Sequence, residues 1–363
     1  MTLQLSARHR PRYELLTFYK FVDLPPRLLP LLAQEHLDFC RDIGLRGRVY
    51  LGSEGISATV SGNRGQTHAY RLYLQASPYF HDIADIDSKA SPVDGHQFPR
   101  MSVKLREEIV ALGHRVTAAE VERFRREISP GEFKAILDGP ERENYLILDM
   151  RNDYEYRLGH FKHALPAGTV NFREVPALLE RYRQQAAGKK IIWYCTGGIR
   201  CEKAAVLANQ LGAGEFYALQ GGVVKYVNQF NDGNWLGNLY TFDDRVSTPV
   251  GDEHTHRTIG RCCYSDQPSD HCENCRHAPC NAHLIARPRE YRRHGGFCSA
   301  ECYAAAQEDG LVRAVAWDDF DYRAARRAGR WDELRAHLQS LVPANLRWRH
   351  AHSQREECRH DDG

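Results

Sequence analysis

The sequence has no long apolar run and no large excess of charge of either sign. No uninterrupted apolar stretch approaches the roughly 18 residues that a bilayer-spanning helix needs, and the N-terminal segment MTLQLSARHRPRYELL lacks the apolar core and cleavage site of a signal peptide. A formal net charge of +2 excludes a chain-wide attraction to nucleic acid or membranes, so any such partner must use local patches. We therefore expect a soluble, cytoplasmic protein that does not contact membranes.

Common cofactor motifs are also missing. The chain has no Gly-x-Gly-x-x-Gly dinucleotide fingerprint, no haem attachment motif and no evident His-x-Asp iron triad. No nucleotide cofactor is therefore expected. Eleven cysteines are present, but the count is odd and seven of them lie between Cys262 and Cys302. In a chain of this length, such clustering favours reduced thiols used for chemistry or metal binding over a disulfide framework.

The 363 residues, 42% of them hydrophobic, are too many for one ordinary core and predict two or three domains. The expected fold class is α+β followed by α/β. The first domain shows a β-α-β-β-α-β order typical of ferredoxin-like folds, and the second alternates apolar strands with helices, which favours a parallel sheet. The expected regions are a ferredoxin-like domain (1–112), a linker helix (113–128), a parallel α/β domain (129–242), a Cys-rich region (243–310) and a helical, Arg-rich tail with a disordered end (311–363).

Individual elements follow from periodicity and turn residues. In the first domain, strands are expected at 13–22, 46–51 and 55–61, with an extended segment at 80–89 and an edge strand within 98–112. Helices are expected at 25–44, 64–76 and 117–127. In the second domain, two apolar strands end near Asp149 and Cys195. Functional residues of parallel sheets lie beyond the carboxyl ends of the strands, so these two positions are candidates for the active site.

The segment that follows the second of these strands predicts a reactive thiol. Its glycines let successive backbone N–H groups surround the Cys195 sulfur at the start of the next helix. These dipoles and a nearby arginine lower a thiol pKa and favour a nucleophilic thiolate at neutral pH. The alternative is a small buried hydrophobic residue. The loop consists of Cys195, Thr196, Gly197, Gly198, Ile199, Arg200 and Cys201.

Loop length separates two chemistries. A phosphatase loop needs its arginine six positions after the cysteine, whereas Arg200 is five positions after Cys195. The smaller loop suits the terminal sulfur of a persulfide. Cys201 is either a second redox thiol or a packed helix residue. Asp149 and Arg151 are expected to support the loop as an ion pair rather than to react, and neither His160 nor His163 is expected to act as a base.

Three motifs in order resemble the rhodanese-type sulfurtransferases: LDMRNDYEYRLGHFKHALPAG, YCTGGIRC and LQGGVVKY. A narrower resemblance is carried by LGSEGISATVSG, by DSK followed by FPRMSVKLREEIVALG, and by CTGGIRCEKA. These motifs are similar to the rhodanese-domain tRNA uridine hydroxylases. The resemblance implies oxygen-dependent 5-hydroxylation of the wobble uridine of tRNA, with molecular oxygen as co-substrate and Cys195 essential. Ser57 and Ala58 depart from the Asn-Gly expected in the family's Glu-Gly-Ile-Asn-Gly-Thr turn.

Hydroxylation does not follow from the residues without the resemblance, and two other functions stay open. One is a sulfurtransferase that carries a persulfide on Cys195 to a small thiol, a protein or RNA. The other is a regulatory module that only holds a partner, which the intact loop argues against. The tRNAs, the electron donor, protein partners and the oligomeric state are not predicted.

The Cys-rich region predicts a structural zinc site, because paired cysteines at short spacing close tetrahedral metal sites. The expected ligands are Cys272, Cys275, Cys298 and Cys302. A metal-free segment is the alternative. Competing ligands are Cys262, Cys263, Cys280, His271, His277 and His283.

A tRNA partner needs cations for phosphates and an aromatic or base-reading surface. The best single patch is RPREYRR, in which a tyrosine interrupts four arginines. Its cations are Arg287, Arg289, Arg292 and Arg293. Other candidates are Arg8, Arg10 and Arg12 near the N-terminus, and Arg100, Lys104 and Arg106 on the expected edge strand.

Overall fold

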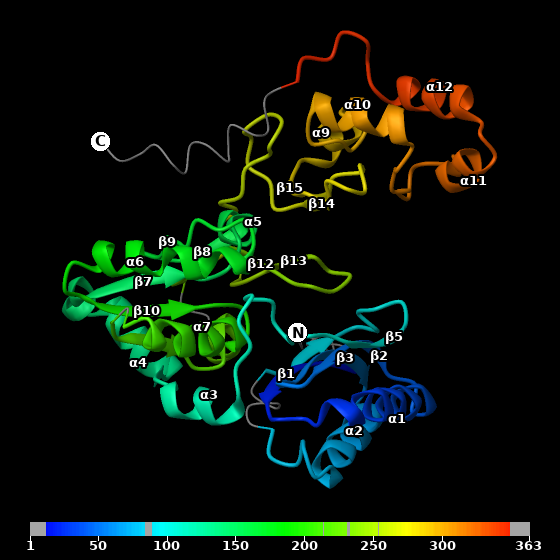
Figure 1. The fold of residues 1–363 in the computed structure, drawn as a ribbon. Coiled ribbons are helices and arrows are strands. Elements are labelled where there is room, and N and C mark those ends of the chain that lie inside the picture. Colours follow the sequence, from blue (N-terminus) through cyan, green and yellow to red (C-terminus); the bar gives the residue numbers. More distant parts are fainter. Residues whose placement is uncertain (1–11, 84–88, 213, 231–232, 253, 349–363) are drawn as a thin grey trace, which may run out of the picture. The chain divides into compact units, whose positions relative to one another are not determined.

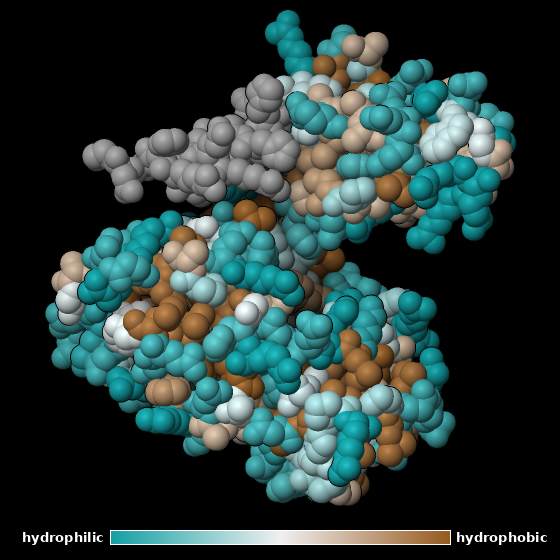
Figure 2. All heavy atoms as spheres, in the orientation of Figure 1, coloured by the Kyte–Doolittle hydropathy of each residue, from teal (hydrophilic) through white to brown (hydrophobic). Residues whose placement is uncertain are grey.

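The computed structural model describes most of the chain (Figure 1). Among the described residues, no helix is long and apolar enough to cross a membrane. Figure 2 shows hydrophilic side chains over most of the visible surface, with apolar side chains in separate patches. The described residues are 12–83, 89–212, 214–230, 233–252 and 254–348.

The chain forms two compact units. Unit 1 contains both the N-terminal sheet and the parallel sheet, and unit 2 contains the Cys-rich region and the C-terminal helices. Unit 1 comprises residues 1–152, 162–234 and 242–245, and unit 2 comprises 153–161, 235–241 and 246–363.

The N-terminal part of unit 1 is a five-stranded sheet in the order β4-β1-β3-β2-β5. Alternation along the strands sends apolar side chains to one face, where Leu16, Phe18 and Val49 share a core with α1 and α2. Asn63 caps α2 through a capping box with Gln66. The elements are β1 (Tyr13–Phe21), α1 (Leu29–Asp42), β2 (Arg46–Gly52), β3 (Gly55–Asn63), α2 (Arg64–Ala76), β4 (Ser91–Val93) and β5 (Met101–Leu105).

One part of the expected N-terminal fold differs. The fourth strand of the ferredoxin-like order is the short β4, which pairs antiparallel with β1. The expected edge strand is β5, which pairs in parallel with β2 at the opposite edge and adds a fifth strand. The expected extended segment is not extended where it is described, since residues 80–82 form turns; residues 84–88 lie outside the described residues. Its polar composition predicts a turn equally well.

The second part of unit 1 confirms the expected parallel α/β fold. Its sheet has the order β6-β11-β10-β7-β9, and every pairing is parallel. Helices α6 and α7 share the core on one face with Leu148 and Trp193, while Phe133 of α4 packs edge-on against Tyr226 of α8.

One short helix, α3, connects these parts. The expected helix at 117–127 is shorter, because α3 ends at Phe124 and the chain then enters β6. The elements of this part are α3 (Ala118–Phe124), β6 (Glu127–Ile128), α4 (Pro130–Asp138), β7 (Tyr145–Asp149), β9 (Leu165–Pro166), α6 (Val175–Ala186), β10 (Lys190–Tyr194), α7 (Ile199–Gln210), β11 (Phe216–Leu219) and α8 (Gly222–Gln229).

Unit 2 is held together around a buried arginine. Arg276 is fully buried; it forms an ion pair with Asp318 and donates to the carbonyl oxygen of Gly295 at 3.1 Å. Phe297, Tyr322 and Leu334 form the adjacent apolar core. The elements are α5 (Asp153–Leu158), β8 (Gly159–Phe161), β12 (Trp235–Tyr240), β13 (Ser247–Pro249), β14 (Cys272–Asn274), β15 (His283–Ile285), α9 (Pro288–Arg293), α10 (Ala300–Asp309), α11 (Tyr322–Arg327) and α12 (Trp331–Leu341).

Candidate active site

Cys195 lies directly after β10, where the loop turns into α7. The cysteine is 1% exposed, and the backbone N–H of Gly198 donates to its Sγ at 3.1 Å. Gly198 adopts a φ of +103°, a conformation that favours glycine. The loop therefore points an N–H group and the positive end of a 12-residue helix at the sulfur.

This environment favours the thiolate of Cys195. Burial alone raises a thiol pKa, but the hydrogen bond from the Cys201 thiol, the charge of Arg200 and the N–H groups of these two residues outweigh it and lower the pKa of Cys195 to about 5. The pKa of Cys201 is raised by its own burial and by its neighbour Cys195. The two opposite shifts favour a thiolate at Cys195, with Cys201 as its protonated hydrogen-bond donor.

The remaining loop residues divide between support and access. Arg200 donates to the Thr196 hydroxyl at 3.2 Å, which keeps the guanidinium beside the loop. Ile199 packs against an apolar cluster that includes Phe21 and Val206. A Cβ added at Gly197 would meet nothing within 4 Å, so the loop is open at that position.

Asp149 and Arg151 form a fully buried ion pair next to the loop. The Arg151 Nε donates to the Asp149 Oδ1 at 2.9 Å, and the Tyr194 hydroxyl donates to the Asp149 Oδ2 at 2.8 Å. Tyr194 immediately precedes the catalytic candidate. The pair therefore holds the end of β10 from the neighbouring strand β7.

Gly222, which belongs to the sequence motif LQGGVVKY, supports the loop from the other side. The N–H groups of Val223 and Val224 donate at 3.0 Å to the carbonyl oxygens of Cys195 and Thr196. A Cβ at Gly222 would lie 2.4 Å from the Cys195 oxygen, so a side chain is excluded there. In the sequence, the Gly-Gly pair at the start of α8 is the signal that could have indicated this close approach.

The N-terminal domain also reaches this loop, which the sequence analysis missed. The Tyr19 hydroxyl of β1 donates to the carboxylate of Glu202 in α7, and a Cβ at Gly198 would lie 2.5 Å from the same hydroxyl oxygen. The ammonium group of Lys89 lies 4.5 Å from the centre of the Tyr19 ring. Glu202 and Lys203 are adjacent charged residues in a buried helix. Buried charges need partners of opposite charge or hydrogen bonds, so this pair could have indicated contacts from another part of the chain.

In unit 2, four cysteines lie close enough to bind one metal ion. Their sulfur atoms all lie within 4.8 Å of one another, and the set is Cys275, Cys280, Cys298 and Cys302. The Cys280 and Cys298 sulfurs are 3.7 Å apart, and those of Cys298 and Cys302 are 3.4 Å apart. A tetrahedral Zn–S₄ site with bonds of about 2.3 Å has sulfurs about 3.8 Å apart, so the cluster fits such a site.

Cys272 does not join this cluster, and Cys280 takes the position expected for it. Side chains alternate along an extended chain, so residues three apart, such as Cys272 and Cys275, leave opposite faces. Cys272 instead packs with Leu158 and Ile285 in another apolar cluster. Cys280 reaches Cys275 because the chain reverses between β14 and β15.

The arginine patch lies on α9 and just before it. Arg287, Arg289, Arg292 and Arg293 are exposed. Tyr291 between them is 3% exposed, and its hydroxyl donates to the Asn274 carbonyl at 2.8 Å. The expected aromatic partner of this patch is therefore a core residue. Arg12, Arg100, Lys104 and Arg106 are exposed, whereas Arg8 and Arg10 lie outside the described residues.

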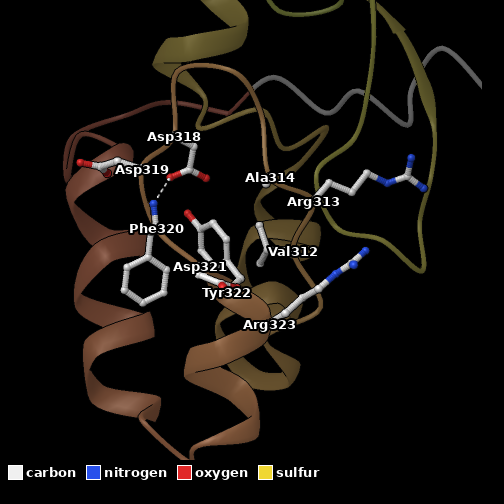
Figure 3. A pocket seen from close by; sticks show the side chains of 9 residues that line it. All are labelled: Val312, Arg313, Ala314, Asp318, Asp319, Phe320, Asp321, Tyr322 and Arg323. Atoms are coloured by element: carbon white, nitrogen blue, oxygen red, sulfur yellow. Dashed lines mark hydrogen bonds between the residues drawn. The ribbon is translucent and has the colours of Figure 1, made fainter. Parts of the chain in front are cut away.

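A hollow of about 640 Å³ lies in unit 2 between α11 and the preceding loop (Figure 3). Asp318 lines it, but this carboxylate is engaged by Arg276 and by His337 at 3.0 Å. The proximity of Asp318, Asp319 and His337 is thus accounted for by an internal ion pair. The hollow is also lined by two cationic side chains, Arg313 and Arg323. Because both signs of charge are present, the lining does not favour an anionic or a cationic ligand.

Comparisons with known proteins agree with the geometry of both sheets. Three family models match: the UPF0176 acylphosphatase like domain over residues 13–109, the Rhodanese-like domain over 129–229 and the Rhodanase C-terminal domain over 236–303. Curated relatives named tRNA uridine(34) hydroxylase occur in Oceanobacillus iheyensis (35% identical over 80% of this chain and 88% of the relative), Bacillus licheniformis (35%, 80% and 88%) and Listeria welshimeri (36%, 80% and 89%).

Proposed function

The chain belongs to the tRNA uridine(34) hydroxylase family, and from this membership we propose that it hydroxylates the wobble uridine of tRNA at carbon 5. The observation that carries the proposal is the buried Cys195 thiolate at the N-terminus of α7, in a chain that shares about a third of its residues with relatives of that name over most of their length. The protein is thus an oxidoreductase of tRNA modification, with molecular oxygen as its co-substrate.

In this proposal, the residues of the loop have separate roles. Cys195 supplies the nucleophilic sulfur, and the Gly198 N–H and Arg200 stabilise negative charge on sulfur or on a bound oxygen atom. Cys201 donates a hydrogen bond to the thiolate. Asp149 and Arg151 hold the end of β10, and Gly222 lets α8 approach the loop carbonyls.

A second candidate function is persulfide transfer. It is favoured by the lowered pKa of Cys195, because a thiolate is the nucleophile that takes up a sulfur atom from a donor to form a persulfide. Both functions need the same thiolate. They differ in the product, which is a hydroxylated nucleoside in one case and a thiolated acceptor in the other.

We also propose that the four-cysteine cluster binds structural zinc. Four thiolate donors at tetrahedral spacing are typical of closed structural sites, and such a site leaves no position for substrate. Cys275, Cys280, Cys298 and Cys302 would hold the ion, which would tie the β14–β15 turn to the start of α10. Its contribution is to the folding of unit 2.

The tRNA is proposed to use the exposed arginines Arg287, Arg289, Arg292 and Arg293 for phosphate contacts. A tRNA substrate supports a cytoplasmic location. The proposed domain boundaries lie at residues 112, 128, 242 and 310. The family models over 13–109 and 129–229 each fall within one proposed domain, whereas the model over 236–303 crosses the boundary at 242.

Nucleoside mass spectrometry of tRNA from a deletion strain tests the function. The strain should lose 5-hydroxyuridine derivatives, regain them with the wild-type chain and not with Cys195→Ser, because serine keeps the shape but forms no thiolate at neutral pH. Loss of a thiolated nucleoside would favour sulfur transfer. Wild-type levels with Cys195→Ser would exclude the nucleophile.

A further inference from the structure

The face of the N-terminal sheet opposite α1 and α2 carries two rows of side chains that cross four strands. Register places Thr17, Thr59, Arg48 and Ser102 in one row, and Tyr19, Ser57, Tyr50 and Lys104 in the other. Their neighbours Phe18 and Val49 face the helices. We call these eight side chains the open sheet face.

The open sheet face is accessible and basic. Arg48 and Lys104 are exposed, and the other six side chains are partly exposed. None of the eight is acidic. Exposed Arg106, at the end of β5, lies with its guanidinium 5.3 Å from the centre of the Tyr50 ring. The face thus combines cations, an aromatic ring and hydroxyl groups, and the carboxylate of Glu202, which accepts from the Tyr19 hydroxyl, lies at one end of it.

This surface is continuous with the catalytic loop. Tyr19, at one end of the second row, lies against Gly198, while Lys104 ends the same row on the edge strand β5. Three strand spacings of about 4.8 Å separate the two ends, or roughly 14 Å. A ligand lying along this row would therefore reach from the sheet edge to the loop that carries Cys195.

Single-stranded RNA fits this combination best. Its unstacked bases pack on aromatic rings and guanidinium planes, its phosphates attract cations, and its 2′-hydroxyls bond to polar side chains. The two rows cross four strands, and a sheet surface of four strands is large enough to stack two or three bases. A double helix offers no free base faces to Tyr50. The chemistry therefore points to a single-stranded loop.

We propose that the open sheet face binds the loop nucleotides that flank the modified uridine, with Tyr50 stacking on a base and Arg48, Lys104 and Arg106 contacting phosphates. This inference rests on the proposed function, because it assumes an RNA substrate. It adds a role for the N-terminal domain: this domain positions the uridine, and the loop at Cys195 performs the chemistry.

The test measures binding of a synthetic RNA hairpin with an anticodon-type loop and a wobble uridine, over a range of salt concentrations. Tyr50→Leu should weaken binding by on the order of 10-fold, and Tyr50→Phe should restore it, because the ring carries the stacking. Arg48→Gln with Lys104→Gln should flatten the logarithmic salt slope by about 1.4, for two lost phosphate contacts.

Matched controls lie on the opposite side of the same domain. Arg41 in α1 and Arg64 in α2 are equally exposed cations, and Arg41→Gln with Arg64→Gln should leave affinity and salt slope unchanged. Alkylation of Cys195 should proceed at the wild-type rate in every variant, which verifies that the fold is intact. An equal loss in the control pair, or wild-type affinity with Tyr50→Leu, would overturn the proposal.

Failure of the two proposals can be told apart. If the wild-type chain neither binds the hairpin nor restores 5-hydroxyuridine in a deletion strain, the proposed function fails and this inference with it. If the wild-type chain modifies tRNA and the sheet variants do so at the same rate at limiting tRNA, only the inference fails. If an acidic peptide binds to the open sheet face and RNA does not, the proposal of RNA as the ligand of this face is wrong.

Discussion

The ammonium nitrogen of Lys203 lies 2.8 Å from each carboxylate oxygen of Glu54, a residue 149 positions earlier in the chain. Both side chains are buried, and Lys203 also contacts Glu108 at 2.7 Å. Lys203 is in α7, the helix that begins at the Cys195 loop, and Glu54 is in the turn between β2 and β3. This buried network ties α7 to the N-terminal domain.

The first prediction concerns this network. Lys203→Met should lower the free energy of unfolding by about 3 to 5 kcal/mol, because it leaves the buried carboxylate of Glu54 and the partly buried carboxylate of Glu108 without their cation. Urea unfolding measures the loss. The matched control is Arg126→Gln, which breaks the exposed Arg126–Glu215 pair and should cost less than about 1 kcal/mol. Similar losses in both variants would show that the buried network is not special.

The second prediction is the pH profile of Cys195. Because the folded pKa is lowered to about 5, the thiolate persists above that pH, and the alkylation rate should stay nearly constant from pH 6 to pH 8 and fall below about 5. Cys201→Ala removes a hydrogen-bond donor and should move the midpoint upward. A rate that rises until the ordinary thiol pKa, with or without Cys201, would contradict the thiolate.

Arg200 provides a third prediction. Arg200→Lys keeps the positive charge but loses the planar fork that bonds to Thr196. The variant should retain the low-pH alkylation of Cys195 and lose most 5-hydroxyuridine formation in the complemented deletion strain. Full activity with lysine would mean that charge alone is sufficient.

The fourth prediction separates the two candidate ligand sets for zinc. Cys280→Ser should reduce the zinc content of the purified protein and destabilise unit 2, while Cys272→Ser should leave the metal in place, since Cys272 packs in a different cluster. Elemental analysis without added metal makes the comparison. Zinc loss with Cys272→Ser alone would restore the set expected from the sequence.

The fifth prediction concerns the arginines at α9. Replacement of Arg287, Arg289, Arg292 and Arg293 by glutamine should weaken binding of intact tRNA and reduce its salt slope, without changing alkylation of Cys195. Because Tyr291 is buried, its ring is not available to stack on a base, so Tyr291→Leu should not weaken tRNA binding in protein that remains folded. An unchanged salt slope would place the phosphate contacts elsewhere on the chain.

Local sequence predicted the elements around the catalytic loop well. Strand β10, the glycines and helix α7 follow from an apolar run, a turn and a helical segment that are adjacent in the chain. The same locality explains the errors. The short β4 has too few residues for a periodic signal, and the side chains of Cys272 and Tyr291 face directions set by the strand and helix around them.

The sequence by itself indicated the parallel α/β fold, the position of Cys195 at the end of a strand and the clustering of cysteines in one region, because each of these follows from patterns among neighbouring residues. Tertiary structure decided the partners that come from distant segments. Tyr19 reaches Gly198 and Glu54 pairs with Lys203 only after the chain has folded. Such contacts are set by strand register and domain packing, which no local pattern encodes.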